Sequence, residues 1–215
     1  MTSEKSKVRV TVSDNGPYMV TGDIPLAKQT ITTNAEDGSE AWQEGSAVAH
    51  RETYALCRCG ASQTKPFCDG SHLKIGFVGN ETASRELTDA ESLCAFARFC
   101  DPNGNVWSQV SQTDDGEVRT MFVRQVNECP SGRLVAWNKV SGKPVEHALP
   151  VSIGLIEDPE QQCSGPLWLR GGIPVVASDR FEYEVRNRVT LCRCGESKNK
   201  PFCDGTHAAI KFSDS

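Results

Sequence analysis

The feature that most constrains this chain is a cysteine-rich segment that occurs twice. Residues 56–77 read LCRCGASQTKPFCDGSHLKIGF and residues 191–212 read LCRCGESKNKPFCDGTHAAIKF, identical at 15 of 22 positions without a gap. Upstream, GPYMVTGDIPL at 16–26 aligns with GPLWLRGGIPV at 165–175. A repeat of this kind indicates that one structural unit is present twice in the chain.

Short strands are predicted on both sides of the repeat. The first copy carries 14 extra residues between Pro25 and Cys57, since the upstream match is offset by 149 positions and the cysteine match by 135. We expect these residues in NAEDGSEAWQEGS (34–46), a polar stretch typical of a surface loop. Alternation and short apolar runs predict strands at 8–12, 18–20, 53–56, 167–169, 175–177, 181–185 and 188–191.

The segment between the copies has a different pattern. LTDAESLCAFARFC (87–100) places Thr88 and Glu91 as a capping box and predicts a helix. A second helix is predicted over 118–129 and a strand over 133–137. The expected fold class is therefore α+β, with a first half at 1–79, an α+β insert at 80–150 and a second half at 151–215. We expect the two duplicated β-rich halves to pack about a pseudo-two-fold axis, by analogy with two-fold dimers.

Each copy contains a set of four possible metal ligands. No secretion signal is visible, so clustered cysteines are better interpreted as metal ligands than as disulfides. Two cysteines of one tight loop can share one metal ion, and Cys68 and His72 share a face if a helix starts at Asp69. Asp69 and Asp204 are then expected to be N-caps. The two sets are Cys57, Cys59, Cys68 and His72, and Cys192, Cys194, Cys203 and His207.

Both copies resemble the CDGSH iron–sulfur family, the mitoNEET-type proteins, through the pattern C-x-C-x2-S-x3-P-x-C-D-G-[ST]-H. The resemblance implies a redox-active [2Fe–2S] cluster at each motif, two per chain, each held by three Cys and one His. It also implies a unit that holds two clusters; in the membrane-anchored members each chain has one motif and pairs with a twin. This chain has both motifs, and we expect a monomer.

The insert resembles divergent single-cluster ferredoxin-like modules through Cys94, Cys100 and the run Cys129-Pro130-Ser131-Gly132. It lacks the C-x2-C-x2-C set that holds a four-iron cluster in bacterial ferredoxins. Cys100 and Cys129 also fit apolar stripes, where a free cysteine packs as a small hydrophobe. The sequence therefore leaves open whether Cys94, Cys100 and Cys129 hold a third cluster.

The single histidine of each set has chemical consequences. A neutral His in place of a fourth thiolate removes one negative charge, so we expect a higher reduction potential than at an all-Cys site. Because a ligand must be deprotonated to bind, acid is expected to protonate His72 and His207 and to release the clusters. The sequence thus predicts electron transfer, pH-sensitive cluster transfer, or both, since the two activities use the same ligands.

Composition and missing motifs exclude several function classes. The net charge of -5 gives no basic surface for nucleic acid, and no apolar run is long enough to cross a bilayer. We expect a cytoplasmic protein, bacterial rather than of the mitochondrial matrix. No nucleotide-binding or nucleophile motif is present, which favours a carrier over an enzyme, with no catalytic residue and with a redox or cluster-acceptor protein as partner.

The alternative from another class is a structural zinc scaffold for protein interaction. Three Cys and one His is a common structural zinc set. The Cys-x-Cys-x8-Cys-x3-His spacing differs from the C-x2-4-C knuckles of such sites, so iron–sulfur binding is the favoured interpretation.

Overall fold

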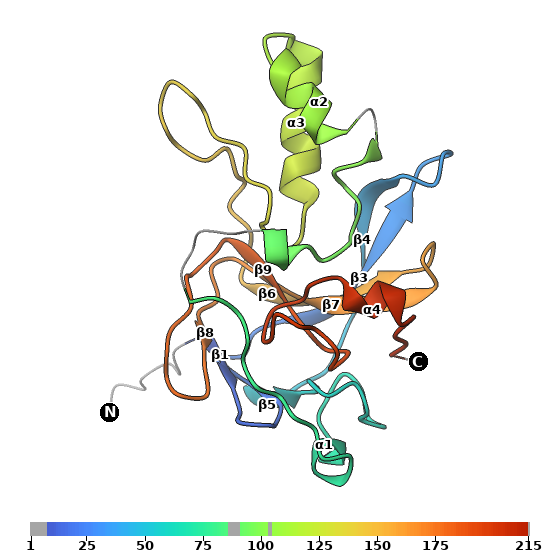
Figure 1. Ribbon diagram of the computed structural model, residues 1–215, viewed down its shortest axis with the longest axis vertical. Helices are drawn as coiled ribbons and strands as arrows, with labels where there is room; N and C mark the ends of the chain where they lie inside the picture. Colours follow the sequence, from blue (N-terminus) through green and yellow to red (C-terminus); the bar gives the residue numbers. More distant parts are fainter. Residues whose placement is uncertain (1–7, 86–90, 103–104, 215) are drawn as a thin grey trace.

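The computed structural model describes residues 8–85, 91–102 and 105–214, which form two sheets and several short helices (Figure 1). The mixed content confirms the α+β class. The strands are β1 Arg9–Val12, β2 Tyr18–Thr21, β3 Leu26–Thr33, β4 Ser39–Ala47, β5 Thr53–Leu56, β6 Ser152–Asp158, β7 Cys163–Arg170, β8 Val175–Val176 and β9 Arg188–Leu191. The helices are α1 Ser71–Lys74, α2 Val106–Gln109, α3 Gly116–Glu128 and α4 Thr206–Ala209, with 3-10 turns at Glu91–Leu93 and Val110–Gln112.

Each sheet contains strands of both sequence copies. One sheet has the order β5-β2-β1-β8 and the other β4-β3-β6-β7-β9. The copies meet where β1 runs parallel to β8 and where β3 runs parallel to β6. The two cysteine segments therefore flank a shared pair of sheets, while α2 and α3 of the insert lie at the opposite end of the long axis from α1 (Figure 1). The domain boundaries given above stay predictions.

The main hydrophobic core receives side chains from both sheets, among them the fully buried Val10, Leu56, Ile153 and Leu191. Leu56 and Leu191 immediately precede the first cysteine of each set. Because these leucines are anchored in the core, both cysteine loops leave the sheets from fixed points.

The expected surface loop at 34–46 is wrong over most of its length. Strand β4 occupies Ser39–Ala47 and pairs antiparallel with β3, placing Trp42 opposite Ile31. The turn is built by Asn34, whose side-chain oxygen accepts the N–H groups of Glu36 and Gly38. β4 is an edge strand with most of its side chains exposed, so its polar composition concealed it.

The helix expected over 87–100 is also absent from the described part of that segment, and Thr88 lies outside the described residues. Only a 3-10 turn at Glu91–Leu93 is present, because Phe96 and Arg98 have φ values of 54° and 60°, which a right-handed helix excludes. In place of the expected strands at 133–137 and 181–185, the structure has isolated bridges, Trp137 with Pro144 and Val176 with Glu182. The predicted second helix is confirmed as α3, capped by Asp115.

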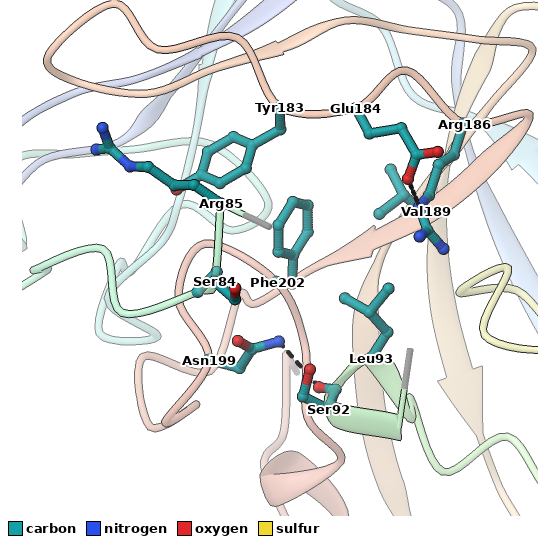
Figure 2. A pocket seen from close by; sticks show the side chains of 11 residues that line it. Ser84, Arg85, Ser92, Leu93, Tyr183, Glu184, Arg186, Val189, Asn199 and Phe202 are labelled. Carbon is teal, nitrogen blue, oxygen red and sulfur yellow. Dashed lines mark hydrogen bonds and ion pairs between the residues drawn. The ribbon is translucent and has the colours of Figure 1, made fainter. Parts of the chain in front are cut away.

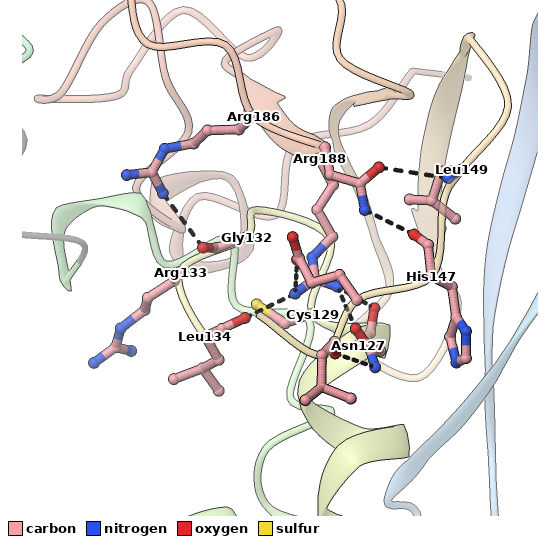
Figure 3. Close-up of polar contacts among 12 residues, drawn as sticks. Asn127, Cys129, Gly132, Arg133, Leu134, His147, Leu149, Arg186 and Arg188 are labelled. Carbon is pink, nitrogen blue, oxygen red and sulfur yellow. Dashed lines mark hydrogen bonds and ion pairs between the residues drawn. The ribbon is translucent and has the colours of Figure 1, made fainter. Parts of the chain in front are cut away.

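A buried arginine joins the insert to the second half. Arg188, on β9, is 2% exposed and donates hydrogen bonds to the carbonyls of Asn127 (2.6 Å) and Leu134 (2.7 Å). It also forms an ion pair with Glu146 at 2.9 Å. Figure 3 shows these contacts converging on one guanidinium, beside Cys129 at the end of α3. The position of the insert thus depends on a residue four positions before Cys192.

Replacing Arg188 with methionine is expected to destabilise the protein by about 2 kcal/mol, because two half-buried carbonyls and a carboxylate lose their partner. Thermal unfolding followed by circular dichroism measures this change. The matched control is Arg186→Met, since Arg186 also contacts the insert, through the Gly132 carbonyl at 3.3 Å, but is half-buried. An equal loss of stability in both variants would contradict the role given to Arg188.

Candidate metal centres

The two cysteine loops are folded in the same way. In the first, the N–H of Cys57 donates to the Pro66 carbonyl at 2.8 Å, and the Ser62 hydroxyl donates to the Phe67 carbonyl at 2.6 Å. The second repeats both bonds, from Cys192 to Pro201 at 2.9 Å and from Ser197 to Phe202 at 2.7 Å. The repeated serine and proline thus hold each loop in a shape that brings its cysteines together.

The predicted ligands approach one another in pairs. The Sγ atoms of Cys57 and Cys59 are 3.8 Å apart, and Cys68 Sγ lies 3.4 Å from His72 Nδ1. Metal–sulfur bonds of about 2.3 Å and metal–nitrogen bonds of about 2.0–2.1 Å in a tetrahedral site require separations of about 3.8 and 3.6 Å. Each pair is therefore spaced to bind one metal ion. In the second set the corresponding separations are 3.7 Å for Cys192 with Cys194 and 3.3 Å for Cys203 with His207.

The two pairs of a loop do not come together around one ion in the described structure. Within the described ranges, no group of three or more His, Cys, Asp or Glu side chains is arranged to hold one metal ion. Two separate pairs per loop suit a centre with two metal ions better than a mononuclear zinc site, which needs four ligands around one ion.

The aspartate after the third cysteine does not cap a helix, contrary to expectation. Helix α1 starts at Ser71, and the N-cap residue is Gly70 in the left-handed conformation, with φ 85°. Asp69 instead accepts the N–H groups of Gln63 (2.8 Å) and Ser71 (2.9 Å), which holds the pKa of its carboxyl well below the usual range. Asp204 makes the equivalent bonds with Lys198 and Thr206. Each aspartate therefore connects its cysteine loop to the start of the following helix.

The two sites differ in burial. In the second, all four predicted ligands are buried, with exposed fractions of 1% for Cys192, 8% for Cys194, 3% for Cys203 and 5% for His207. In the first, Cys57 is buried, whereas Cys59, Cys68 and His72 are half-buried. Burial lowers the pKa of His207 to about 4, which favours the neutral ring that a metal requires. Burial also raises the pKa of the Cys59 thiol to about 11.

One thiol of the second site, that of Cys192, has a lowered pKa. The hydrogen bond from Cys194 lowers the pKa of Cys192 to about 7. The same bond, together with burial, raises the pKa of Cys194. Cys192 is therefore the thiol expected to lose its proton first when a metal binds.

The two loops touch each other through reciprocal backbone contacts. A Cβ atom on Gly60 would lie 2.5 Å from the carbonyl oxygen of Cys194, and one on Gly195 would lie 2.7 Å from that of Cys59. Both glycines have positive φ, 75° and 87°. Only glycine allows the two cysteine loops to approach this closely.

An arginine between the first two cysteines of each set is buried, but its charge is balanced differently. Arg193 forms ion pairs with Glu157, at 2.9 Å, and with Asp214. Arg58 instead donates to the carbonyls of Ser13 and Gly79. Among the described residues no carboxylate pairs with Arg58. Within the described ranges the charge of Arg58 is therefore not balanced by an ion pair, unlike that of Arg193.

The insert contains a third group of cysteines, which the sequence left undecided. Cys94, Cys100 and Cys129 line one mostly apolar pocket, with the half-buried Arg98 and Arg133 beside them. Burial raises the pKa of Cys100 to about 11, and the neighbouring Asp101, Cys129 and Cys94 add to the effect. The chain brings the three together because α3 ends at Glu128, immediately before Cys129 and next to the irregular segment that holds Cys94 and Cys100.

Comparison with protein families matches this arrangement. The family model described as "Iron-binding zinc finger CDGSH type" matches residues 15–73 and again 164–208. The chain is a tandem member of the CDGSH iron–sulfur family. The model described as "Divergent 4Fe-4S mono-cluster" matches residues 83–139 of this CDGSH protein, the region of the three-cysteine pocket. No curated protein and no solved structure matched the chain.

These matches confirm an iron–sulfur protein with two CDGSH regions and, between them, an insert that matches a divergent 4Fe-4S family. None of the helices in the described ranges has the length and apolar character needed to span a membrane.

Proposed function

We propose that this protein binds two redox-active [2Fe–2S] clusters, each held by three Cys and one His, and carries electrons or transfers clusters to acceptor proteins. The observation that carries the proposal is the pairing of ligands: Cys57 with Cys59 at 3.8 Å and Cys68 with His72 at 3.4 Å, repeated in the second loop. Two pairs per loop correspond to the two irons of a [2Fe–2S] cluster.

The chain's own groups support reversible redox chemistry in these loops. The cluster, when bound, supplies the site that gains and loses one electron. Nδ1 of His72 and His207 is the nitrogen beside the thiol, and a neutral imidazole there adds no negative charge. When acid protonates this nitrogen, it can no longer bind the cluster, and the cluster would be released. This release is the basis of pH-sensitive transfer.

Pseudo-two-fold symmetry between the halves is part of the proposal. Strand β2 corresponds in sequence to β7, and β5 to β9. The order β5-β2-β1-β8 in one sheet has its counterpart in β9-β7-β6-β3 in the other. The reciprocal contacts of Gly60 and Gly195 support the same relation. We further propose a monomeric, non-enzymatic carrier in a bacterial cytoplasm that acts on a redox or cluster-acceptor protein, without nucleic acid or membrane.

A second candidate function concerns the insert. We propose that Cys94, Cys100 and Cys129 hold a third iron–sulfur cluster, supported by their common pocket and by the match to a divergent 4Fe-4S mono-cluster family. Two oxygen groups lie beside the thiols: the Asp101 carboxylate, 3.9 Å from Cys100 Sγ, and the Ser131 hydroxyl, 3.5 Å from Cys129 Sγ.

The test is the visible spectrum of anaerobically purified protein, with iron and acid-labile sulfide counted on the same sample. Two [2Fe–2S] clusters and one [4Fe–4S] cluster together give about eight irons and about eight sulfides per chain, and dithionite bleaches the colour. About four of each would leave the insert empty and overturn the second candidate alone. A colourless protein with two zinc ions would overturn the proposal in favour of a structural scaffold.

A further inference from the structure

We propose that the second CDGSH site is an internal electron relay, which connects the three-cysteine site of the insert to the first CDGSH site, where outside partners are met. This inference rests on the proposed function, in which all three sites hold iron–sulfur clusters. It follows from which loops touch, which ligands are covered and where charge is balanced.

The insert lies directly on the second site. A Cβ atom on Gly205 would be 3.1 Å from the carbonyl oxygen of Cys94 and 3.3 Å from Cβ of Phe96. Gly205 is two residues from Cys203 and two from His207. One contact, between Cys94 and Gly205, therefore joins the insert to the segment of the second site that contains Cys203 and His207.

Further contacts hold the insert against the second cysteine loop. The N–H groups of Thr82 and Ala83 donate to the Lys200 carbonyl, and the Thr82 hydroxyl donates to Lys198. The Asn199 amide donates to the Ser92 carbonyl at 2.9 Å, as Figure 2 shows. These bonds reach three consecutive residues of the second cysteine loop. They fix the distance between the two sites, which electron transfer requires.

Apolar packing also stabilises the contact between the insert and the second half. Leu93 and Phe202 face a small cavity between these two parts, and both side chains belong to the main core (Figure 2). The insert is therefore packed into the core of the second half, and the hydrogen bonds of Arg188 to the insert stabilise it further.

The second site in turn touches the first. Gly60 follows Cys59 and packs on the backbone of Cys194, and Gly195 follows Cys194 and packs on the backbone of Cys59. Predicted ligands of the two CDGSH sites are therefore in contact through backbone alone. The second site is the only one of the three, within the described ranges, for which contacts to both of the others are found.

The first site is open where the second is covered. No atom of the described residues lies within 4 Å of a Cβ placed on Gly70, the counterpart of Gly205. An open groove lined by His50, Tyr54 and Phe67 reaches Cys68. Leu73, next to His72, is 79% exposed. A partner protein can approach this site without displacing any part of the described structure.

The charge distribution gives the relay a direction. Arg58 in the first loop has a positive charge without a carboxylate partner among the described residues, whereas Glu157 and Asp214 neutralise Arg193 in the second. A nearby positive charge stabilises the reduced, more negative form of a cluster, and burial keeps water from screening it. Arg58 therefore favours reduction of the first site, as an electron acceptor requires.

The relay moves one electron and forms or breaks no bond. A one-electron donor of the ferredoxin or flavoprotein class is oxidised at the insert, where the three cysteines are half-buried. A one-electron acceptor is reduced at the first site. The insert site, the second site and the first site each gain and then lose the same electron.

The test is electron paramagnetic resonance of the full-length holoprotein during stepwise reduction with dithionite. The signal of the reduced insert site should be broadened or split by the reduced second site. Cys203→Ala should abolish this interaction and Cys68→Ala should leave it intact. Persistence in Cys203→Ala, or loss in Cys68→Ala, would overturn the relay.

Two variants that keep every predicted ligand guard against misfolding. Gly205→Ala pushes on the Cys94 carbonyl and should weaken the spin interaction at an unchanged iron count. Gly70→Ala has the same backbone conformation, φ 85° against 87°, and should not. An identical, unaltered interaction in both variants contradicts the proposed contact.

Iron removal by bathophenanthroline tests the open first site. The chelator should act in two phases, the faster of which is lost in Cys68→Ala and kept in Cys203→Ala. The reverse pattern would overturn the assignment of the first site as the point of exchange. A wild-type protein without an insert signal contradicts the third cluster itself, and the relay with it, whereas a three-cluster spectrum without broadening overturns only the relay.

Discussion

Replacing Gly195 with alanine is expected to lower the thermal midpoint of the holoprotein by about 8–16 °C, which corresponds to about 4 kcal/mol in a chain of this size. The added Cβ would lie 2.7 Å from the carbonyl oxygen of Cys59, and neither backbone has a flexible end that can move aside. Gly60→Ala should behave alike, since its Cβ would lie 2.5 Å from the carbonyl oxygen of Cys194. Each substitution forces apart the two loops that contain the predicted ligands.

The matched control for both is Gly70→Ala. Gly70 has a similar positive φ, 85°, but a Cβ there meets no atom within 4 Å in the described part of the chain. This variant should lose only the backbone preference of glycine, about 1 kcal/mol, or about 2–4 °C. Thermal unfolding followed in parallel by circular dichroism and by visible absorbance separates loss of fold from loss of cluster. Equal losses in all three variants would show that the loops are not in the contact described here.

Exchanging a histidine ligand for cysteine is expected to have the largest redox effect. His72→Cys and His207→Cys each add a negative charge at a cluster, and should lower its reduction potential by on the order of 100 mV or more. Optical redox titration measures the shift. The control is His147→Cys, an exposed position outside both motifs, which should leave both potentials unchanged.

The same variants should differ in acid. His207 is buried with a pKa lowered to about 4, so at pH 5 its ring stays neutral in the folded protein and becomes protonated only as the pH falls through about 4. His72 is half-buried and accessible to solvent. At pH 5, bleaching of visible absorbance should therefore proceed mainly at the first site, and His72→Cys should slow it. Unchanged bleaching in the double variant would rule out protonation of the histidines as the cause.

Local features of the fold could be predicted because they depend on residues close in sequence. β1, β2, β5 and β9 follow short apolar runs, and α3 follows a helical stripe behind the cap of Asp115. β4 could not be predicted, because an exposed edge strand needs no apolar face. The helix expected around Cys94 failed because Phe96 and Arg98 take left-handed backbone conformations that no local pattern signals.

The sequence by itself determined the pairing of the predicted ligands, since Cys-x-Cys and Cys-x3-His place their atoms together through a single loop and a single helical turn. It also determined the duplication. Only the tertiary structure decided that the two sites are unequal. Three features distinguish the second site: Cys194 and His207 are buried, Cys94 contacts Gly205, and Glu157 neutralises Arg193. Each of these features depends on residues that are distant in the chain. Two nearly identical loops thus acquire different solvent access and charge, because packing against the insert covers one and leaves the other open.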